Sequence, residues 1–202
     1  MAPLVPRMDV FEFADFDWFP KFLRPYFQAA LTAAWTTDIP FLHRTTPARL
    51  VARLLSTHLP PPLSSYTIID FCAGGGGPSP FIERYLNTPS SRPGAAEEGE
   101  QVRVVLTDLH PHPTLWQEAA ARRPGGALSY VAHPVDAANV PASLVEEFRG
   151  GGGGEGTVRT GTGGRRKVFR MFCLSFHHFG DGLARRILKG TVDGAAVGEG
   201  FG

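Results

Sequence analysis

The stretch "TIIDFCAGGGGPSPFIE", residues 67–83, decides the fold of this chain. An apolar, β-branched run leads into Asp70, four glycines follow at residues 74–77, and Pro-Ser-Pro precedes a helical segment. Glycine loses more backbone entropy on folding than any other residue, so four in succession need a physical reason. Either they form a flexible linker, or they form a loop whose backbone passes very close to something else.

Residues 149–167, "RGGGGGEGTVRTGTGGRRK", show what a glycine linker looks like in this chain. No strand runs directly into it and no helix starts directly after it, and residues 87–101 form a second low-complexity insert. The basic residues 165–167 are interpreted as a solvated flank rather than a phosphate contact. Residues 74–77 lie instead between a strand and a helix start, which predicts a ligand-contacting loop at the carboxyl edge of a parallel sheet. Glycine suits such a loop because a side chain would hold the ligand away from the backbone.

The remaining chain alternates between apolar strand patterns and helical patterns. We predict strands at 66–70, 102–108, 128–136 and 167–175, and helices at 79–86, 112–123, 141–148 and 180–190. This alternation predicts an α/β, doubly wound Rossmann-like sheet covered on both faces, with at most a weak fifth strand near residues 191–198. Two earlier helices are predicted, at 16–36, starting late because of its prolines, and after Thr46. Residues 1–60 are therefore assigned to an N-terminal helical extension or lid, and residues 61–202 to the core.

Composition limits the class of protein. The 202 residues carry a formal net charge of +1, which argues against nucleic acid or an anionic membrane as a partner bound by bulk charge. Two cysteines in apolar runs argue against a disulfide framework and favour a reducing compartment, so we expect a cytoplasmic location without excluding the nucleus. No signal peptide is expected, and no segment reaches the roughly 18 apolar residues of a membrane span. The oligomeric state is not indicated.

The register of the glycine loop excludes two common phosphate motifs. A G-x-G-x-x-G fingerprint fails at Ser79, and no Lys-Ser/Thr pair follows the glycines as a P-loop requires. The pattern that fits is an acid with small residues two, four and six positions later: Asp70, Cys72, Gly74 and Gly76. With "VRVVLTD", "YVAHPVD" and "FCLSFHHF" following in order, the chain resembles the class I S-adenosylmethionine-dependent methyltransferases. It is most similar to a fungal group that shares the "DWFPxxLR" and "DFCAGGGGPTP"-like elements.

The resemblance implies a role for each candidate residue. The cofactor, S-adenosylmethionine, would contact a set made of the glycine loop, the ends of the next two strands and the end of the fourth: Asp70, Cys72, Ala73, Gly74, Gly75, Gly76, Asp108, Leu109, Asp136, Ala137 and Ser175. Asp108 would accept hydrogen bonds from both ribose hydroxyls, because one carboxylate can accept from a cis-diol. Asp136 would accept from the adenine amine. His177 and His178 are the candidate catalytic bases.

Each residue also has a structural interpretation. Asp108 is equally well explained as a cap of the following helix, Asp136 as a turn residue, and the histidines as half-buried residues at a helix entry. A zinc site is disfavoured because no ligand pair has CxxC or HxxxH spacing. Seven strands are typical of the family, so four strands predict a C-terminally truncated member.

The resulting hypothesis is a methyltransferase acting on a small-molecule acceptor. The alternatives are a catalytically inactive binding or structural protein of the same fold, an RNA methyltransferase, and a nicotinamide-dependent oxidoreductase.

Overall fold

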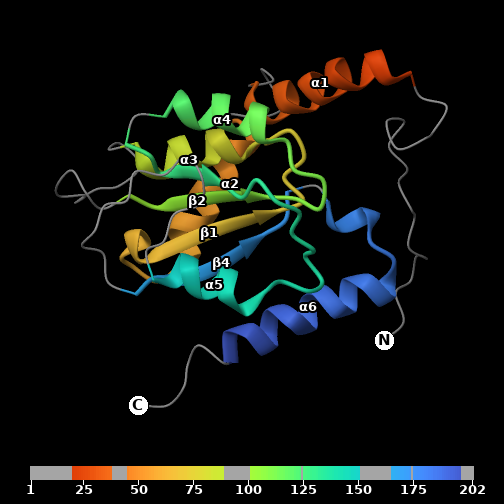
Figure 1. Ribbon diagram of the computed structural model, residues 1–202. Coiled ribbons are helices and arrows are strands. Elements are labelled where there is room, and N and C mark those ends of the chain that lie inside the picture. The colour runs from red at the N-terminus through yellow and green to blue at the C-terminus, as the bar shows by residue number, and fades with distance from the viewer. Residues whose placement is uncertain are drawn as a thin grey trace, which may run out of the picture.

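The computed structural model describes residues 20–37, 45–88, 101–123, 125–150, 165–173 and 175–196. These residues form three layers, with helices on both sides of one parallel sheet (Figure 1). The predicted α/β class and the Rossmann-like alternation of strands and helices are therefore confirmed. The two low-complexity inserts and the segment before Pro20 lie largely outside the described residues.

The sheet contains four strands in the order β3-β2-β1-β4, and every pairing is parallel. They are β1 (Tyr66–Phe71), β2 (Arg103–Thr107), β3 (Leu128–Tyr130) and β4 (Lys167–Met171). β1 lies inside the sheet, and all six of its residues are buried. Parallel pairing brings all carboxyl ends to one edge, so the loops after β1, β2 and β4 are neighbours there.

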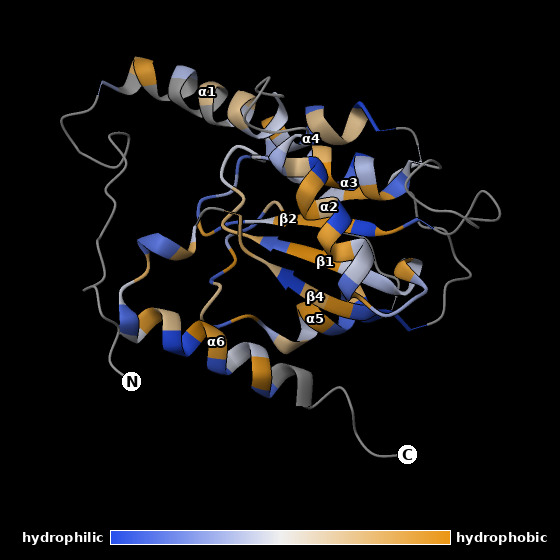
Figure 2. Ribbon diagram, turned by 180° about the vertical axis from the view of Figure 1, so that it is seen from behind, coloured by the Kyte–Doolittle hydropathy of each residue, from blue (hydrophilic) through white to orange (hydrophobic). Residues whose placement is uncertain are grey.

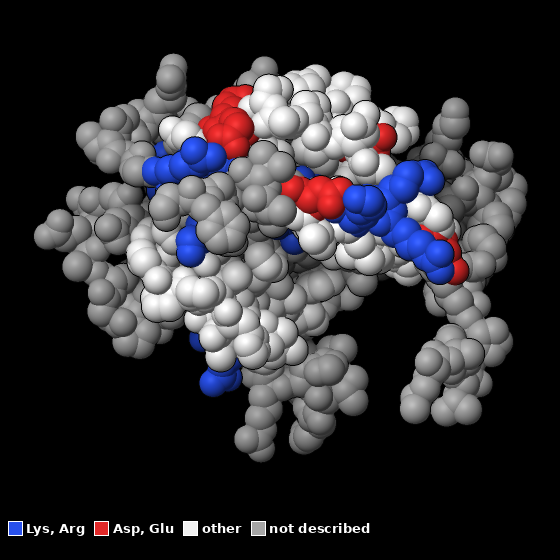
Figure 3. Space-filling model, turned by 90° about the horizontal axis from the view of Figure 1, so that it is seen from below, with Lys and Arg blue, Asp and Glu red and all other residues white. Residues whose placement is uncertain are grey.

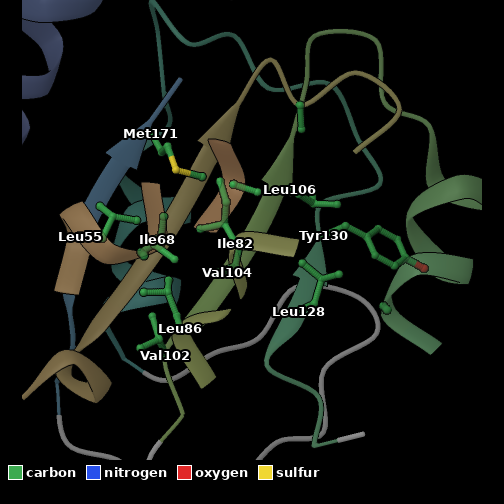
Figure 4. Close-up of a cluster of buried hydrophobic side chains, with 14 of the residues drawn as sticks. Leu55, Ile68, Ile82, Leu86, Val102, Val104, Leu106, Leu128, Tyr130 and Met171 are labelled. Atoms are coloured by element: carbon green, nitrogen blue, oxygen red, sulfur yellow. The ribbon is translucent and has the colours of Figure 1, made fainter. Parts of the chain in front are cut away.

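One face of the sheet packs against α2 (Pro47–His58), α3 (Ser79–Asn87) and α4 (Pro113–Ala121). Because side chains alternate along a strand, Ile68, Val104 and Leu106 point into this cluster while their chain neighbours point away. Figure 4 shows the strand side chains meeting Leu55 of α2 and Ile82 of α3. Since α2 shares this core, it packs with the sheet rather than apart from it.

The opposite face packs against α5 (Ala142–Arg149) and α6 (Asp181–Ala196). Ile69 and Val105 point to this side, where they join Phe148 of α5 and Ile187 of α6. In Figure 2 the apolar residues follow the strands at the centre of the molecule. β4 is at an edge of the sheet, and its burial runs from the exposed Lys167 to the buried Met171.

The predicted helices are confirmed, with shifted ends. α1 (Arg24–Thr36) starts late, as its prolines predicted, after the short 3-10 helix η2 (Lys21–Leu23). Thr46 caps α2, because its hydroxyl accepts from the Arg49 amide at 3.2 Å. Two further 3-10 turns are η3 (Leu63–Ser65) and η5 (Phe176–His178).

Two strand predictions were wrong in extent, and a third was wrong in kind. β3 ends at Tyr130 rather than at residue 136, and β4 ends at Met171 rather than at residue 175. Residues 191–196 belong to α6 and form no fifth strand, because the helical pattern of the preceding residues continues through them.

Within the described ranges, no helix combines the length and the apolar character needed to cross a bilayer.

Candidate ligand site at the carboxyl edge of the sheet

The loop between β1 and α3 needs its glycines for backbone conformation. Gly74, Gly76 and Gly77 have φ values of +52°, +105° and +47°, a region that side chains disfavour. A Cβ atom at Gly74 would meet nothing within 4 Å, so space is not what demands glycine there. Cys72 adopts φ +61° with a side chain, which marks a position of backbone strain beside the loop. The run of glycine is therefore a turn with open space beside it.

Three hydrogen bonds fix this loop, two to the end of β2 and one to α4. The Ala73 amide donates to the Thr107 carbonyl at 3.0 Å, and the Gly74 amide donates to Asp108 Oδ2 at 2.8 Å. The buried Trp116 of α4 donates from Nε1 to the Gly74 carbonyl at 2.9 Å. These contacts define the β2 side of the carboxyl edge as a preformed wall.

Two amides of the loop are left over for a ligand. Within the described part of the chain, the Gly75 and Gly77 amides donate no hydrogen bond to another protein group. Gly75 is exposed and Gly77 is half-buried. Backbone donors at a strand-to-helix turn are groups that ligands commonly use in open α/β sheets.

Asp70 is the most perturbed acid at this edge. It is 0% exposed, and burial raises its pKa from 3.8 to about 7, although the Ser79 hydroxyl and the Cys173 backbone amide oppose the shift. Ser79, the first residue of α3, donates from Oγ to Asp70 Oδ2 at 2.5 Å. Asp70 Oδ1 is buried without a hydrogen bond of good geometry. A buried carboxylate oxygen without a well-formed hydrogen bond is costly, so the site favours a ligand that brings a donor or a positive charge near it.

Asp108 lies one residue beyond β2 and is half-buried. Its Oδ2 accepts from the Gly74 amide, and its Oδ1 accepts from the His110 amide at 2.8 Å. The second contact closes a local turn at residues 108–110. The prediction that Asp108 caps the following helix was wrong, because α4 starts at Pro113 and its N-cap is His112. A carboxylate has about four acceptor positions, so both oxygens keep capacity for a further donor.

Asp136 is exposed, and its Oδ1 accepts from the Ala138 amide at 2.8 Å. This hydrogen bond is the one expected of a turn residue, and a contact with adenine stays a prediction. The backbone joins this turn to the rest of the edge, because the Val135 amide donates to the Asp108 carbonyl at 2.8 Å. Of the other predicted contacts, Ala73 and Ala137 are buried and Leu109 is 51% exposed.

The three acids converge electrostatically on Cys72. Its pKa rises to about 11, first through burial, then through the Asp108 charge, with smaller contributions from Asp70 and Asp136. The Ser175 hydroxyl lies close enough to the thiol to oppose this rise. No described Lys or Arg contributes. The geometry thus brings Asp70, Cys72, Asp108, Asp136 and Ser175 into one acidic site.

The β4 side of the carboxyl edge is less complete. Ser175 is buried, and its Oγ atom lacks a hydrogen bond of good geometry. Next to it, a Phe cluster lines the strand ends. Phe71 stacks on Phe172 with ring centroids 5.5 Å apart, and Phe172 contacts Phe176 edge to face with ring centroids 5.3 Å apart. His177 and His178 follow in η5, with ring centroids 3.9 Å apart. They lie two and three residues after Ser175, and their role as bases stays a prediction.

Sequence reasoning missed three residues that build the site: Ser79, Thr107 and Trp116. Thr107 Oγ1 donates to the Asp70 carbonyl at 3.0 Å, so it joins the two strand ends. A buried Trp normally donates its N–H to a hydrogen-bond acceptor, and this rule could have indicated that Trp116 bonds to a nearby carbonyl. Ser79 carried a weaker signal, a hydroxyl in the first helical turn after a buried acid.

Comparisons with known proteins give no name to this arrangement. No family model, curated protein or solved structure matches the chain. Among the described residues, no group of three or more His, Cys, Asp or Glu side chains is arranged to hold one metal ion.

Proposed function

We propose that the carboxyl edge binds S-adenosylmethionine and that the protein transfers its methyl group to a small-molecule acceptor. One observation carries this proposal: Asp70, Asp108 and Asp136 act together on Cys72 with no described basic side chain among them. An all-acidic site repels pyrophosphate and attracts ligands with positive charge and hydrogen-bond donors. Adenosylmethionine offers a sulfonium, an ammonium, two ribose hydroxyls and an adenine amine.

The residues fit such a ligand in several places. Asp108 would accept from the ribose hydroxyls with its remaining lone pairs, and Asp136 from the adenine amine. Asp70 Oδ1, which has no hydrogen bond of good geometry, would be stabilised by a donor or cation near it. The Gly75 amide would meet the ligand in the open space beside Gly74.

When bound, the cofactor supplies an already activated methyl group. The chain then has to orient the acceptor, exclude water and remove a proton. The Phe cluster at the ends of β1 and β4 favours exclusion of water. His177 or His178 would accept the acceptor's proton, because a neutral imidazole carries a basic ring nitrogen.

A second function, binding without catalysis, is favoured by one specific observation. Asp108 and Asp136 each accept a hydrogen bond from a backbone amide, at 2.8 Å in both cases, so both stabilise the local backbone without a ligand. If these acids only stabilise their turns, the protein keeps its fold and binds no cofactor. The two proposals therefore differ in a measurable affinity.

Calorimetric titration with S-adenosylhomocysteine, beside NADH, tests the proposal. We expect micromolar affinity for the first and none for the second. Asp108→Asn should reduce the affinity at least about tenfold, because a hydrogen bond to a charged group contributes roughly 1.5–3 kcal/mol.

The matched control is Glu118→Gln, an exposed residue of α4 that pairs only with Arg122 in the described structure. It should leave the affinity unchanged. Unchanged affinity in a folded Asp108→Asn variant would contradict the ribose role. Absence of binding by the folded parent chain would overturn the cofactor proposal.

A further inference from the structure

A second pocket lies away from the acidic edge, between α5, β4 and α6. It has a volume of about 240 Å³, below the range of roughly 300–1,000 Å³ that holds drug-sized ligands. Apolar wall residues come from α5 and the segment before it, and charged residues line the rest: Val140, Ala142, Val145, Glu146, Arg149, Arg170, Gly190 and Asp193. Such a space suits a small molecule with an apolar body and a charged group.

Arg170 is the group in this pocket that lacks compensation. It is half-buried on β4, and no described carboxylate lies within ion-pair distance of its guanidinium. Its protein contacts are a long hydrogen bond of 3.4 Å to Thr191 Oγ1 and the Phe71 ring, 5.7 Å from its Cζ. Burial lowers its pKa, and the nearby charge of Arg149 lowers it further. A half-buried cation beside another cation is stabilised by an anion.

The two acids that line the pocket are already neutralised. Glu146 accepts from Arg149 at 2.8 Å and from Arg165 at 3.0 Å. Asp193 pairs with Lys189 at 2.7 Å. Among the described residues, Arg170 therefore adds a positive charge for which no acid supplies an ion pair. Figure 3 shows Lys and Arg side chains alongside acidic ones on this lower side of the molecule.

We propose that this pocket binds a small organic anion, a carboxylate or a phosphate ester, whose oxyanion pairs with Arg170 and whose apolar part contacts Val140 and Val145. Guanidinium groups hold such oxyanions through paired N–H donors. The site is distinct from the acidic edge in charge and in place, and it does not depend on the cofactor proposal. Phe71 lies between them, since it follows Asp70 and its ring faces Arg170.

The test uses the full chain and four probes: benzoate, phenyl phosphate, inorganic phosphate and benzyl alcohol. Binding is followed by the methyl NMR signals of Val140 and Val145, which line the pocket. We expect benzoate or phenyl phosphate to saturate these shifts, with the tighter of the two identifying the oxyanion class. Benzyl alcohol should bind at least tenfold more weakly, because it lacks the charge.

Variants locate the interaction. Arg170→Gln should weaken binding of the tighter probe at least tenfold, while Arg185→Gln, an exposed arginine of α6, should not change it. Ala142→Trp places a large side chain in the pocket from an exposed position, and it should abolish binding. This variant tests the pocket independently if Arg170→Gln does not fold.

Three results would overturn the proposal. The first is no shift with either organic anion at millimolar concentration. The second is inorganic phosphate binding as tightly as phenyl phosphate, which would leave the apolar wall without a role. The third is full retention of binding in a folded Arg170→Gln variant.

Discussion

The β2 side and the β4 side of the carboxyl edge satisfy their polar groups to different degrees. On the β2 side, the Gly74 amide and carbonyl both have partners, and the Thr107 hydroxyl and carbonyl do as well. On the β4 side, two atoms are buried without a hydrogen bond of good geometry: Ser175 Oγ, and Oδ1 of Asp70, a β1 residue whose carboxyl lies near the Cys173 amide after β4. Both belong to the same sheet edge, so the difference does not come from general exposure.

This difference indicates which side of the edge a bound ligand would stabilise most. Groups whose hydrogen bonding is complete gain little from a new partner. A buried oxygen without a well-formed hydrogen bond gains much more, because a new donor offsets the desolvation cost of burying it. We therefore interpret the β2 side as the fixed wall of the site and the β4 side as the part that a ligand completes.

Trp116 tests the wall most severely. Trp116→Ala should lower the free energy of unfolding by about 3–5 kcal/mol, because it empties a fully buried site and leaves the Gly74 carbonyl without its donor. Trp116→Phe keeps most of the packing and removes only the N–H, so about 1–2 kcal/mol is expected. Urea denaturation measures both. Equal losses in the two variants would show that the hydrogen bond, not the packing, fixes the loop.

Asp70 tests the β4 side through pH. Its folded pKa of about 7 exceeds the ordinary 3.8, so the folded chain holds the proton more tightly and loses stability as pH rises between these values. The difference corresponds to at most roughly 4 kcal/mol, reached above pH 7. Asp70→Asn should remove this loss, making the variant more stable than the parent at pH 8 and similar near pH 4.

Urea denaturation across that pH range checks the Asp70 prediction. Asp193→Asn, an exposed acid of α6, serves as the control and should change the pH profile little. If the free energy of unfolding of the parent chain is constant between pH 4 and pH 8, Asp70 stays ionised in the folded chain. Asp70 Oδ1 could then no longer be counted among the unsatisfied atoms of the β4 side.

A pair of hydroxyls gives the smallest and most direct contrast. Thr107→Val removes a bonded hydroxyl on the β2 side and should cost about 1 kcal/mol. Ser175→Ala removes a hydroxyl on the β4 side that lacks a hydrogen bond of good geometry and lies near the Cys72 thiol, and it should change stability by less than about 0.5 kcal/mol. Thermal or urea unfolding measures both differences. A larger loss at Ser175 than at Thr107 would reverse the assignment of the two sides.

Hydropathy alternation predicted the architecture well. The runs around Ile68 and Val104 carry β-branched residues between turn signals, and such runs rarely suit anything but a buried strand. The site edge was predictable for the same reason, because Asp70 and Asp108 end or follow consecutive strands. Strand ends were not, since "YVAHPVD" keeps apolar residues after the chain has left the sheet at Tyr130.

The partners of the acids were also beyond the sequence. Whether Asp108 grips a ligand or a backbone amide depends on how close the glycine turn comes, and Gly74 sits 34 residues away in the chain. The pocket around Arg170 needs three elements to meet, and the sequence showed only an isolated basic residue within a strand. Long-range approach, rather than local pattern, decides these features.

The register of β1 has a consequence for how the chain folds. Tyr66 pairs with Lys167, 101 positions later, whereas Thr67 pairs with Arg103, only 36 positions later. Closing the longer loop costs about 0.9 kcal/mol more chain entropy by the logarithmic law, and non-local pairings form slowly. On a ribosome, β1 and β2 are synthesised before β4, so we expect them to pair first. We therefore expect the side of the edge whose polar atoms lack well-formed hydrogen bonds to be assembled last.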